Sequence, residues 1–404
     1  MFIRTMCEDS SMIWRNALVG AAALVLAACG DNEQQKAQTL ADEQPATGQV
    51  EIWRFALEEG DDSLQYEYAN RFAEIISQKT AGEVEVRLFP YGRLGSLGEI
   101  QAQLQDGSLQ LALASDVLTE VVPESQLFSL GFALSEDEQS NTRILNDDGF
   151  RKHHDLVDAY REHELQPLAL VPEGWLVWTA NRPVRTPEDL AGLSLGMADN
   201  PVLRETYSAY GANPVTMTGE EVAEALQTDQ VDGSVQTLSR LQQAGWPQSQ
   251  DYLILARQGQ HIATLVAQGD WYDNLSDDHE QAIEETVAEL VPYIHERQAS
   301  TNAKWLEAIG QSADVEIIHL TAEQRAAFQD RGLPMREWLM DSAGARGGRL
   351  LTLLQQHMEE GPAEQEPIAP TDTTHSIETR TSPVTGEGDQ TRNASDDAAE
   401  SVTP

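Results

Sequence analysis

The sequence predicts an α/β protein of two lobes, with a cleft between the lobes and a long helix that bridges both. Three observations predict this fold. Strand and helix periodicities alternate along the chain from residue 51, the same local pattern occurs twice, and a long helical stretch follows the second copy. With 404 residues, 40% of them hydrophobic, the chain has enough apolar material for two cores.

The first copy of the pattern alternates two strand types with amphipathic helices. Apolar residues at helical spacing indicate the helices. Val84, Val86 and Leu88 alternate with charged residues and indicate a strand. The pattern predicts a strand at 52–57, a helix at 64–76, a strand at 84–88, a helix at 99–105 and a strand at 109–113.

The second copy begins with a helix start at Thr186-Pro187-Glu188-Asp189, where Thr caps the helix and Pro takes its first position. The periodicity after it predicts a strand at 193–197, a helix at 203–210, a strand at 214–217, a helix at 218–227 and a strand at 231–235. Strands that alternate with helices favour parallel sheets with helices on both faces.

A long helical pattern runs from Ser276 to about Gly310, with Pro292 inside it. A helix of that length, kinked at Pro292, is suited to bridging both lobes. Ligands of open α/β sheets lie beyond the carboxyl ends of the strands, so two facing lobes predict a cleft between them. We expect the strands near 171–178 and 255–262 to act as the hinge.

The amino terminus predicts export. Residues 17–28 are uncharged and mostly apolar, and twelve residues rise about 18 Å as a helix, too short for a hydrocarbon core of roughly 30 Å. Leu26-Ala27-Ala28-Cys29 resembles the bacterial lipobox, which implies cleavage before Cys29 and lipid on its thiol. The alternative is an ordinary signal peptide. The expected location is periplasmic or at the cell surface, with a lipid anchor in a bacterial membrane.

Charge and cysteine content exclude several classes of function. The net charge of −41 disfavours nucleic acid and anionic lipid as partners. Both cysteines precede residue 30, so the body offers no thiolate nucleophile and no cysteine-based zinc site. His153-His154-Asp155 is interpreted as a solvated polar helix face, since adjacent helical residues point about 100° apart. No metal or cofactor is expected.

The predicted division of the chain follows from these patterns. It comprises a lipoprotein signal peptide at 1–28, a flexible tether at 29–49, lobe I at 50–172 with 258–306, lobe II at 173–257 with 307–345, a C-terminal helix at 346–360, and an acidic tail at 361–404. The tail holds no aromatic residue, and we expect it to be disordered.

Several motifs, in order along residues 50–345, resemble one family, the substrate-binding subunits of TRAP (tripartite ATP-independent periplasmic) transporters. The motifs are Thr80-Ala81-Gly82 with Pro90-Tyr91-Gly92-Arg93-Leu94-Gly95, Asn181-Arg182-Pro183 with Gly192-Leu193, Tyr210-Gly211-Ala212-Asn213-Pro214, Val231-Asp232-Gly233, and Asp270-Trp271. The resemblance implies a periplasmic-binding-protein-like fold that closes on a small organic solute and delivers it to an ion-gradient-driven permease.

The predicted site departs from that family's pattern. The resemblance places a ligand-binding arginine at a position that is Gly196 here, and a second one near Trp175. An amide that family members often carry corresponds to Gln236. Because an unpaired ligand carboxylate is costly to bury, we expect either another cation or a ligand that is not a simple monocarboxylate.

Other candidates are open to a structural interpretation. Arg204 could replace the lost arginine or be a solvated helix charge, and Trp175 and Trp178 could hold a cationic, zwitterionic or sugar-like ligand or pack within a lobe. Glu58, at the end of the first strand, could face a ligand ammonium group or be a solvated loop acid.

The predicted function is capture of a small organic acid or zwitterion by lobe closure, followed by delivery to a TRAP permease. Three alternatives stay open at this point: a ligand sensor for a membrane receptor or sensor kinase, a hydrolase or lyase, and a surface interaction module. The catalytic motifs of common hydrolases and nucleotide enzymes are absent, so the chain is predicted not to be an enzyme.

Overall fold

The computed structural model describes residues 50–361, except 117, 244–249 and 312–314. The predicted signal peptide and tether, with Cys29, and the tail from residue 362 lie outside the described residues, as does Trp246. Within the part that is described, no helix is both long and apolar enough to span a bilayer.

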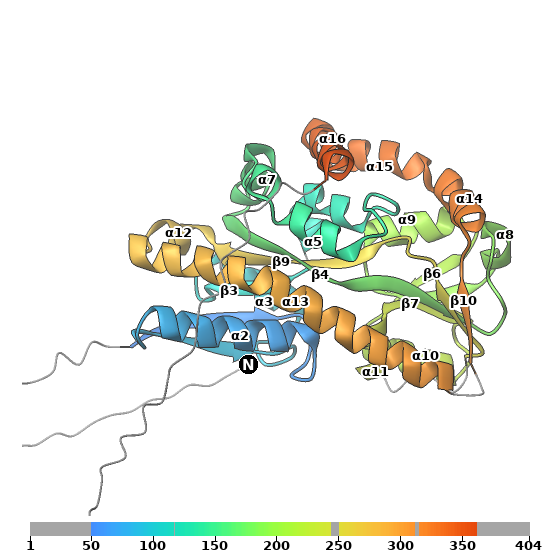
Figure 1. Ribbon diagram of the computed structural model, residues 1–404, viewed down its shortest axis with the longest axis horizontal. Helices are drawn as coiled ribbons and strands as arrows, with labels where there is room; N and C mark the ends of the chain where they lie inside the picture. The colour runs from blue at the N-terminus through green and yellow to red at the C-terminus, as the bar shows by residue number, and fades with distance from the viewer. Residues whose placement is uncertain (1–49, 117, 244–249, 312–314, 362–404) are drawn as a thin grey trace, which may run out of the picture.

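Two sheets share the long strand β4 and form the two lobes (Figure 1). The first sheet contains β1 (Glu51–Leu57), β2 (Val84–Phe89), β3 (Leu111–Ala114), β9 (Gln260–Gln268) and β4 (Leu165–Ala180). The second contains β4 with β5 (Ser194–Met197), β6 (Asn213–Thr216), β7 (Gly233–Thr237), β8 (Tyr252–Leu255) and β10 (Glu316–His319). The two-lobe α/β prediction is confirmed.

The sheets are mixed, so the expectation of parallel sheets is wrong in part. Neighbours within each βαβ unit are parallel, as predicted: β1 with β2 and β3, and β5 with β6 and β7. However, β9 runs antiparallel to β3 and β4, and β4 runs antiparallel to β7 and β8. The reason is that β4 and β9 carry the chain between the lobes and add to each sheet from outside its βαβ unit.

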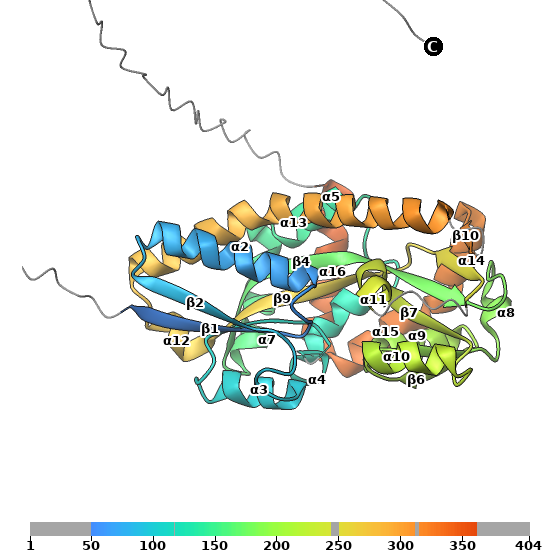
Figure 2. The same cartoon turned by 90° about the horizontal axis from the view of Figure 1, so that it is seen from below.

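Helices cover both faces of the first sheet (Figures 1 and 2). They are α2 (Leu64–Lys79), α3 (Leu97–Gln105), α4 (Leu118–Val121), the 3-10 helix η1 (Pro123–Ser129), α5 (Glu138–Leu145), α6 (Asp148–Arg151), α7 (His154–Arg161) and α12 (Gly269–Asp273). Alternation along β1 sends Phe55 and Leu57 to a core under α2 and Ala56 to the opposite core.

The second lobe and the C-terminal region carry the remaining helices. They are α8 (Pro187–Leu190), α9 (Pro201–Ala209), α10 (Gly219–Gln227), α11 (Leu238–Gln243), α14 (Ala322–Gly332), α15 (Pro334–Ser342) and α16 (Gly344–Glu360). Met335 and Leu339 of α15 and Leu350 of α16 pack into a core of the first lobe, so the C-terminal helices return to that lobe.

The long bridging helix is present as α13 (Asp277–Gln311), with Pro292 inside it. Its first half buries Ile283 and Leu290 in the core of the first lobe, whereas Ile309 near its end packs in the second lobe. Figure 2 shows α13 running along both lobes. The prediction of a helix that bridges both lobes is confirmed.

Candidate functional site

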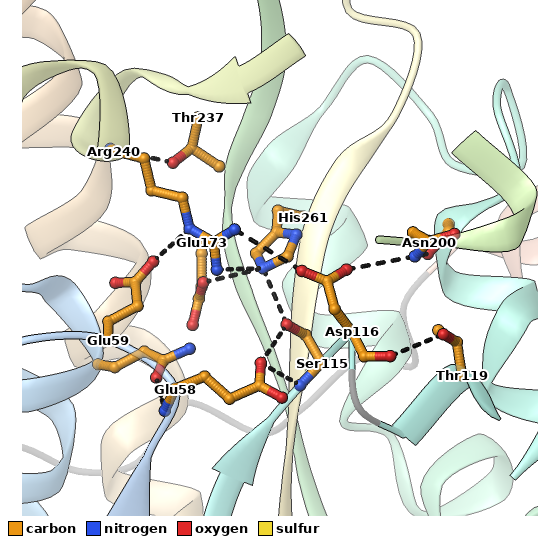
Figure 3. A network of polar contacts seen from close by, with 12 residues as sticks. Glu58, Glu59, Ser115, Asp116, Thr119, Glu173, Asn200, Thr237, Arg240 and His261 are labelled. Carbon is orange, nitrogen blue, oxygen red and sulfur yellow. Dashed lines mark hydrogen bonds and ion pairs between the residues drawn. The ribbon is translucent and has the colours of Figure 1, made fainter. Parts of the chain in front are cut away.

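Charged and polar side chains of both lobes meet at the junction of the two sheets (Figure 3). We call this cluster the acidic centre: Glu58, Glu59, Asp116 and Glu173, with Ser115, Arg240 and His261. Three of the four acids and Ser115 directly follow β1 or β3, Glu173 lies on β4, His261 on β9, and Arg240 on α11 after β7. The centre thus occupies the carboxyl ends of strands of both lobes, where α/β sheets bind ligands.

Glu58 links the ends of β1 and β3. Its Oε2 accepts hydrogen bonds from the backbone N–H of Ser115 at 2.8 Å and from Ser115 Oγ at 2.7 Å. Burial and the negative charge of Asp116 raise the pKa of Glu58 to about 7, and the Ser115 bonds offset only part of that rise. Glu58 therefore changes its charge near neutral pH.

Glu173 is the most deeply buried acid of the centre, 3% exposed. Among the described residues, neither of its carboxylate oxygens accepts a hydrogen bond of normal geometry, and Gln65 beside it has an unsatisfied Nε2. His261 Nε2 lies 3.4 Å from Glu173 Oε2. Burial, with repulsion by Glu59, raises the pKa of Glu173 well above its usual range. The raised pKa favours the protonated, neutral form of Glu173, and the amide of Gln65 and the imidazole of His261 are its polar neighbours.

His261 is neutral at physiological pH. Burial, helped by the positive charge of Arg240, lowers its pKa to about 4. His261 Nε2 lies 3.0 Å from Ser115 Oγ and 3.2 Å from Nη2 of Arg240. Arg240 can only donate, whereas Ser115 gives its one proton to Glu58 and can only accept, so these two neighbours favour opposite tautomers of the imidazole. A neutral His261 therefore bonds one of the two through Nε2.

Arg240 is the cation of the centre and reaches it from the second lobe. Its Nε donates to Glu59 Oε1 at 2.6 Å, and its Nη1 lies 3.7 Å from Asp116 Oδ2. Although burial opposes its charge, Glu59 and Asp116 raise the pKa of Arg240 above its ordinary value. Four acids face this single arginine, so the formal charge of the described centre is negative.

A second polar bridge crosses the lobes beside the centre. Asn200, which caps α9 through its Oδ1, donates from Nδ2 to Ser129 Oγ at 2.9 Å and to Asp116 Oδ1 at 3.3 Å. Asp116 therefore contacts residues that follow β5 and β7 of the second lobe, and the two lobes are in polar contact in this structure.

The structure brings two of the predicted site residues to the junction. Glu58 is part of the acidic centre, and Trp175 lies two residues after Glu173 on β4 and is paired with Gln260. The indole Nε1 of Trp175 is buried and has no acceptor among the described residues. A buried donor and the buried acceptor of Glu173 thus lie on one short segment.

Gly196 and Trp178 lie within the second lobe. Even a Cβ at Gly196 would lie 3.1 Å from Met217 Sδ and 3.3 Å from Val222 Cγ2, so apolar groups fill the space beside it. Trp178 is fully buried and packs edge-on against Tyr207 and Phe328. This burial supports the lobe-packing interpretation of Trp178.

Arg204 and Gln236 are not among the residues of the acidic centre. Arg204 is 41% exposed at its side chain and forms an ion pair with Asp199 beside it in the chain. Gln236 is buried on β7, opposite Val177 of β4 and four residues before Arg240. Gln236 therefore lies next to the end of β7, from which the chain continues directly to Arg240 of the acidic centre.

Sequence reasoning missed Asp116, Glu173, Arg240 and His261. The rule that selected Glu58, an acid at the carboxyl end of a strand, would also have found Asp116 after β3. Glu173 and His261 lie within the strands expected near 171–178 and 255–262, but no signal marked them there, because they are inside a strand and not at its end.

The His153-His154-Asp155 group differs from its predicted form. Because α7 begins at His154, His153 lies outside the helix as its cap, and ligand atoms of all three residues come within 4.8 Å of one another. Asp155 is buried rather than solvated and is held by Arg349, with Nε donating at 2.8 Å. A hollow of about 570 Å³ adjoins this group and lies away from the acidic centre. The guanidinium of Arg349 binds the carboxylate of Asp155, which a metal ion would need as a ligand.

Comparison with known proteins identifies the family. Residues 55–339 match the family model of bacterial extracellular solute-binding proteins, family 7. The ectoine/5-hydroxyectoine-binding periplasmic protein UehA of Ruegeria pomeroyi is 29% identical over 308 residues, 75% of this chain and 89% of the relative. The ectoine-binding periplasmic protein TeaA of Halomonas elongata is 27% identical over 316 residues, 78% of this chain and 92% of the relative.

Solved structures agree with the sequence relatives. A TRAP periplasmic solute-binding protein of Marinobacter aquaeolei, in an open form without ligand, has a TM-score of 0.71 and 35% identity, and covers 75% of this chain and 99% of its own. The structure of TeaA has a TM-score of 0.71 and 26% identity, with 77% and 100% covered. These relatives are solute-binding proteins of transporters and not enzymes, which confirms the non-enzyme prediction. The chain belongs to the family 7 bacterial extracellular solute-binding proteins, as a periplasmic substrate-binding subunit of the TRAP type.

Proposed function

We propose that this protein captures a small zwitterionic or cationic solute between its lobes and delivers it to a TRAP permease. The observation that carries the proposal is the acidic centre, where four buried or partly buried acids face one arginine and neither oxygen of Glu173 accepts a hydrogen bond of normal geometry among the described residues. A cation close to Glu173 would favour its ionised form and offset the cost of burying that charge, so the positive group of a solute suits this place.

The absence of arginine at two positions supports the same class of solute. The resemblance places ligand-binding arginines near Trp175 and at Gly196, and the space beside Gly196 is filled by Met217 and Val222. The site therefore has fewer cations for an anionic group and more acids for a cationic group than that pattern implies. UehA and TeaA bind ectoine, a zwitterion, which makes ectoine a natural first candidate.

An organic acid is the second candidate, because Arg240 could turn from the acids to a ligand carboxylate. The C4-dicarboxylate-binding protein DctP of Rhodobacter capsulatus is 26% identical over 333 residues of this chain. The sensor alternative has no such support among the relatives, which are solute-binding proteins of transporters.

The mechanism follows from the position of the centre. A solute held at the carboxyl ends of strands of both lobes would contact both of them only when they are closed, so it would shift an open-to-closed equilibrium toward the closed form. The strands near 171–178 and 255–262 would provide the hinge, since β4 passes from one sheet to the other at Trp175–Leu176.

A thermal-shift screen tests the proposed solute class. The full mature chain, with Cys29→Ser to keep it free of lipid, is measured with ectoine, other zwitterions, cationic amines, C4-dicarboxylates and neutral sugars. A solute at 100 times its dissociation constant should add about 2.7 kcal/mol of stability. Shifts for zwitterions or cations that disappear in Glu173→Gln support the proposal. A shift for dicarboxylates alone would refute the cationic preference.

We also propose that Cys29 carries a lipid anchor that holds the protein at the membrane that contains the permease. The support is the apolar segment at 17–28, which ends in Leu26-Ala27-Ala28 directly before Cys29. Labelled palmitate should enter the wild-type chain and not the Cys29→Ser chain in the producing bacterium. Equal labelling of both would refute the anchor.

A further inference from the structure

Arg240 belongs to the second lobe and contacts residues of the first, as a ligand bound between the lobes would. It projects from α11 of the second lobe, after the capping bond from its own N–H to Thr237 Oγ1, and its head group lies among acids of the first lobe (Figure 3). Its side chain is 19% exposed, and that of Glu59, its main partner, is 6% exposed. The contact therefore joins the two lobes in a largely water-free place.

The acceptors around Arg240 suit a planar cation. Glu59 Oε1 lies 2.6 Å from Nε, His261 Nε2 lies 3.2 Å from Nη2, and Asp116 Oδ2 lies 3.7 Å from Nη1. Two guanidinium nitrogens thus face carboxylates that follow β1 and β3, and the third faces the imidazole of His261 on β9. A planar cation with several donors is the group that such an arrangement binds.

The centre holds more acceptors than Arg240 uses. Neither oxygen of Glu173 accepts a hydrogen bond of normal geometry among the described residues, and Glu58 Oε2 accepts bonds from Ser115. A permanent structural ion pair would need one carboxylate per guanidinium. The surplus fits a site whose full complement includes a cation other than Arg240.

We propose that the guanidinium of Arg240 is a tethered occupant of the cation subsite, which links the lobes in the absence of solute and which the positive group of a solute displaces. The inference rests on the proposed function for the existence of that solute, but not for the subsite itself. It makes Arg240 a specificity-determining residue, because a solute must offer a better set of donors to the acids than the protein's own arginine does.

Chemical complementation tests the subsite without the natural solute. Arg240→Ala removes the guanidinium and leaves the acids in place, and ethylguanidinium is the probe. Arg204→Ala is the matched control, since Arg204 is an arginine paired with one acid outside the centre. At millimolar concentrations, ethylguanidinium should raise the melting temperature of Arg240→Ala in a saturable way and leave the wild type and Arg204→Ala unchanged. Ethylguanidinium that has no effect on folded Arg240→Ala, or the same effect on all three proteins, overturns the proposal.

A distance measurement covers the case in which Arg240→Ala does not fold. The described body contains no cysteine, so spin labels at Glu74→Cys on α2 and Glu224→Cys on α10, both exposed, would report the separation of the lobes. Arg240→Gln should shift the solute-free population to longer distances, and ethylguanidinium should reverse the shift. An unchanged distance distribution in Arg240→Gln contradicts the link between the lobes.

The two proposals fail in different ways. If ethylguanidinium rescues Arg240→Ala but no solute of the screen binds the wild type, the subsite stands and the proposed solute class fails. If zwitterions or cations bind the wild type while ethylguanidinium does not bind Arg240→Ala, the proposed function stands and the tethered occupant is refuted.

Discussion

The charge of Glu58 should make the stability of the solute-free protein fall as the pH rises. Burial and Asp116 raise its pKa from 4.5 to about 7 in the folded protein, so the folded state holds a proton that the unfolded state has lost between these two values. The stabilising contribution of the protonated form is fully present below about pH 4.5 and is lost as the pH rises through about 7.

The magnitude follows from the two pKa values. With about 1.4 kcal/mol for each tenfold change in the proton equilibrium, ionising Glu58 costs the folded protein roughly 3 kcal/mol above pH 7. That figure is an upper limit, because the Glu58 side chain is only partly buried. Glu58→Gln keeps an oxygen for the Ser115 donors and cannot ionise, so it should be more stable than the wild type above pH 7 and about equally stable near pH 5.

Urea unfolding at pH 5, 6, 7 and 8 measures the difference. The free energy of unfolding of Glu58→Gln minus that of the wild type should grow across this range by about 1 to 3 kcal/mol. Glu83→Gln, at an exposed site before β2, is the control and should show no such growth. If the free energies of unfolding of Glu58→Gln and the wild type differ by a constant amount from pH 5 to 8, the argument that the fold disfavours the ionised form of Glu58 is wrong.

Three further outcomes follow from the site. Glu173→Gln should weaken binding of a zwitterionic or cationic solute at least tenfold by calorimetry while leaving the fold intact, since the change keeps the size of the side chain and neither carboxylate oxygen accepts a hydrogen bond of normal geometry among the described residues; unchanged affinity would remove it from the subsite. Gln236→Ala should also weaken binding at least tenfold, and equal titrations of both proteins would exclude it. Gly196→Arg should lower the melting temperature and create no dicarboxylate binding, because Met217 and Val222 already fill the space; dicarboxylate binding by this variant would refute the steric argument.

Local order was predictable from the sequence, since each βαβ unit is specified by nearby residues. The helix that begins after Thr186 shows why: Thr186 and Asp189 form a capping box at the predicted position, and Pro187 is the first residue of the helix. The helix from Leu64 buries Tyr68, Phe72 and Ile76 on the predicted face. Contacts of this kind depend on the spacing of residues along the chain, which can be read directly from the sequence.

The length and direction of β4 were not predictable in the same way, although a strand near 171–178 was expected. The sixteen residues of β4 are buried almost throughout, so they show neither the period of a half-exposed strand nor that of a helix. Pro167, Pro172 and Gly174 argue against a long strand, yet register shifts beside them absorb the irregularity. Because β4 pairs with β9 over a separation of some ninety residues, its direction depends on contacts that no local pattern encodes.

The same limit explains which site residues were found. Glu58 and Trp175 follow from positional rules, the end of a strand and the family position of an arginine. No such positional rule selects Arg240. It is one arginine on a short helix, and its role depends on its contact with Glu59 on the other lobe. A cluster drawn from five distant segments becomes visible only when the fold places them together.

The acidic character of the chain also changes its meaning once burial is known. A net charge of −41 indicates a surface that stays soluble by repulsion, and salt screens such charges within about 10 Å at moderate ionic strength. Glu59 and Glu173 are 7% and 3% exposed, so salt screens them little and each needs a partner at contact distance. Arg240 donates to Glu59, whereas Glu173 lies beside the neutral imidazole of His261, at 3.4 Å, and the amide of Gln65. Composition counts both kinds of acid alike, whereas only the buried kind constrains the charge of the solute.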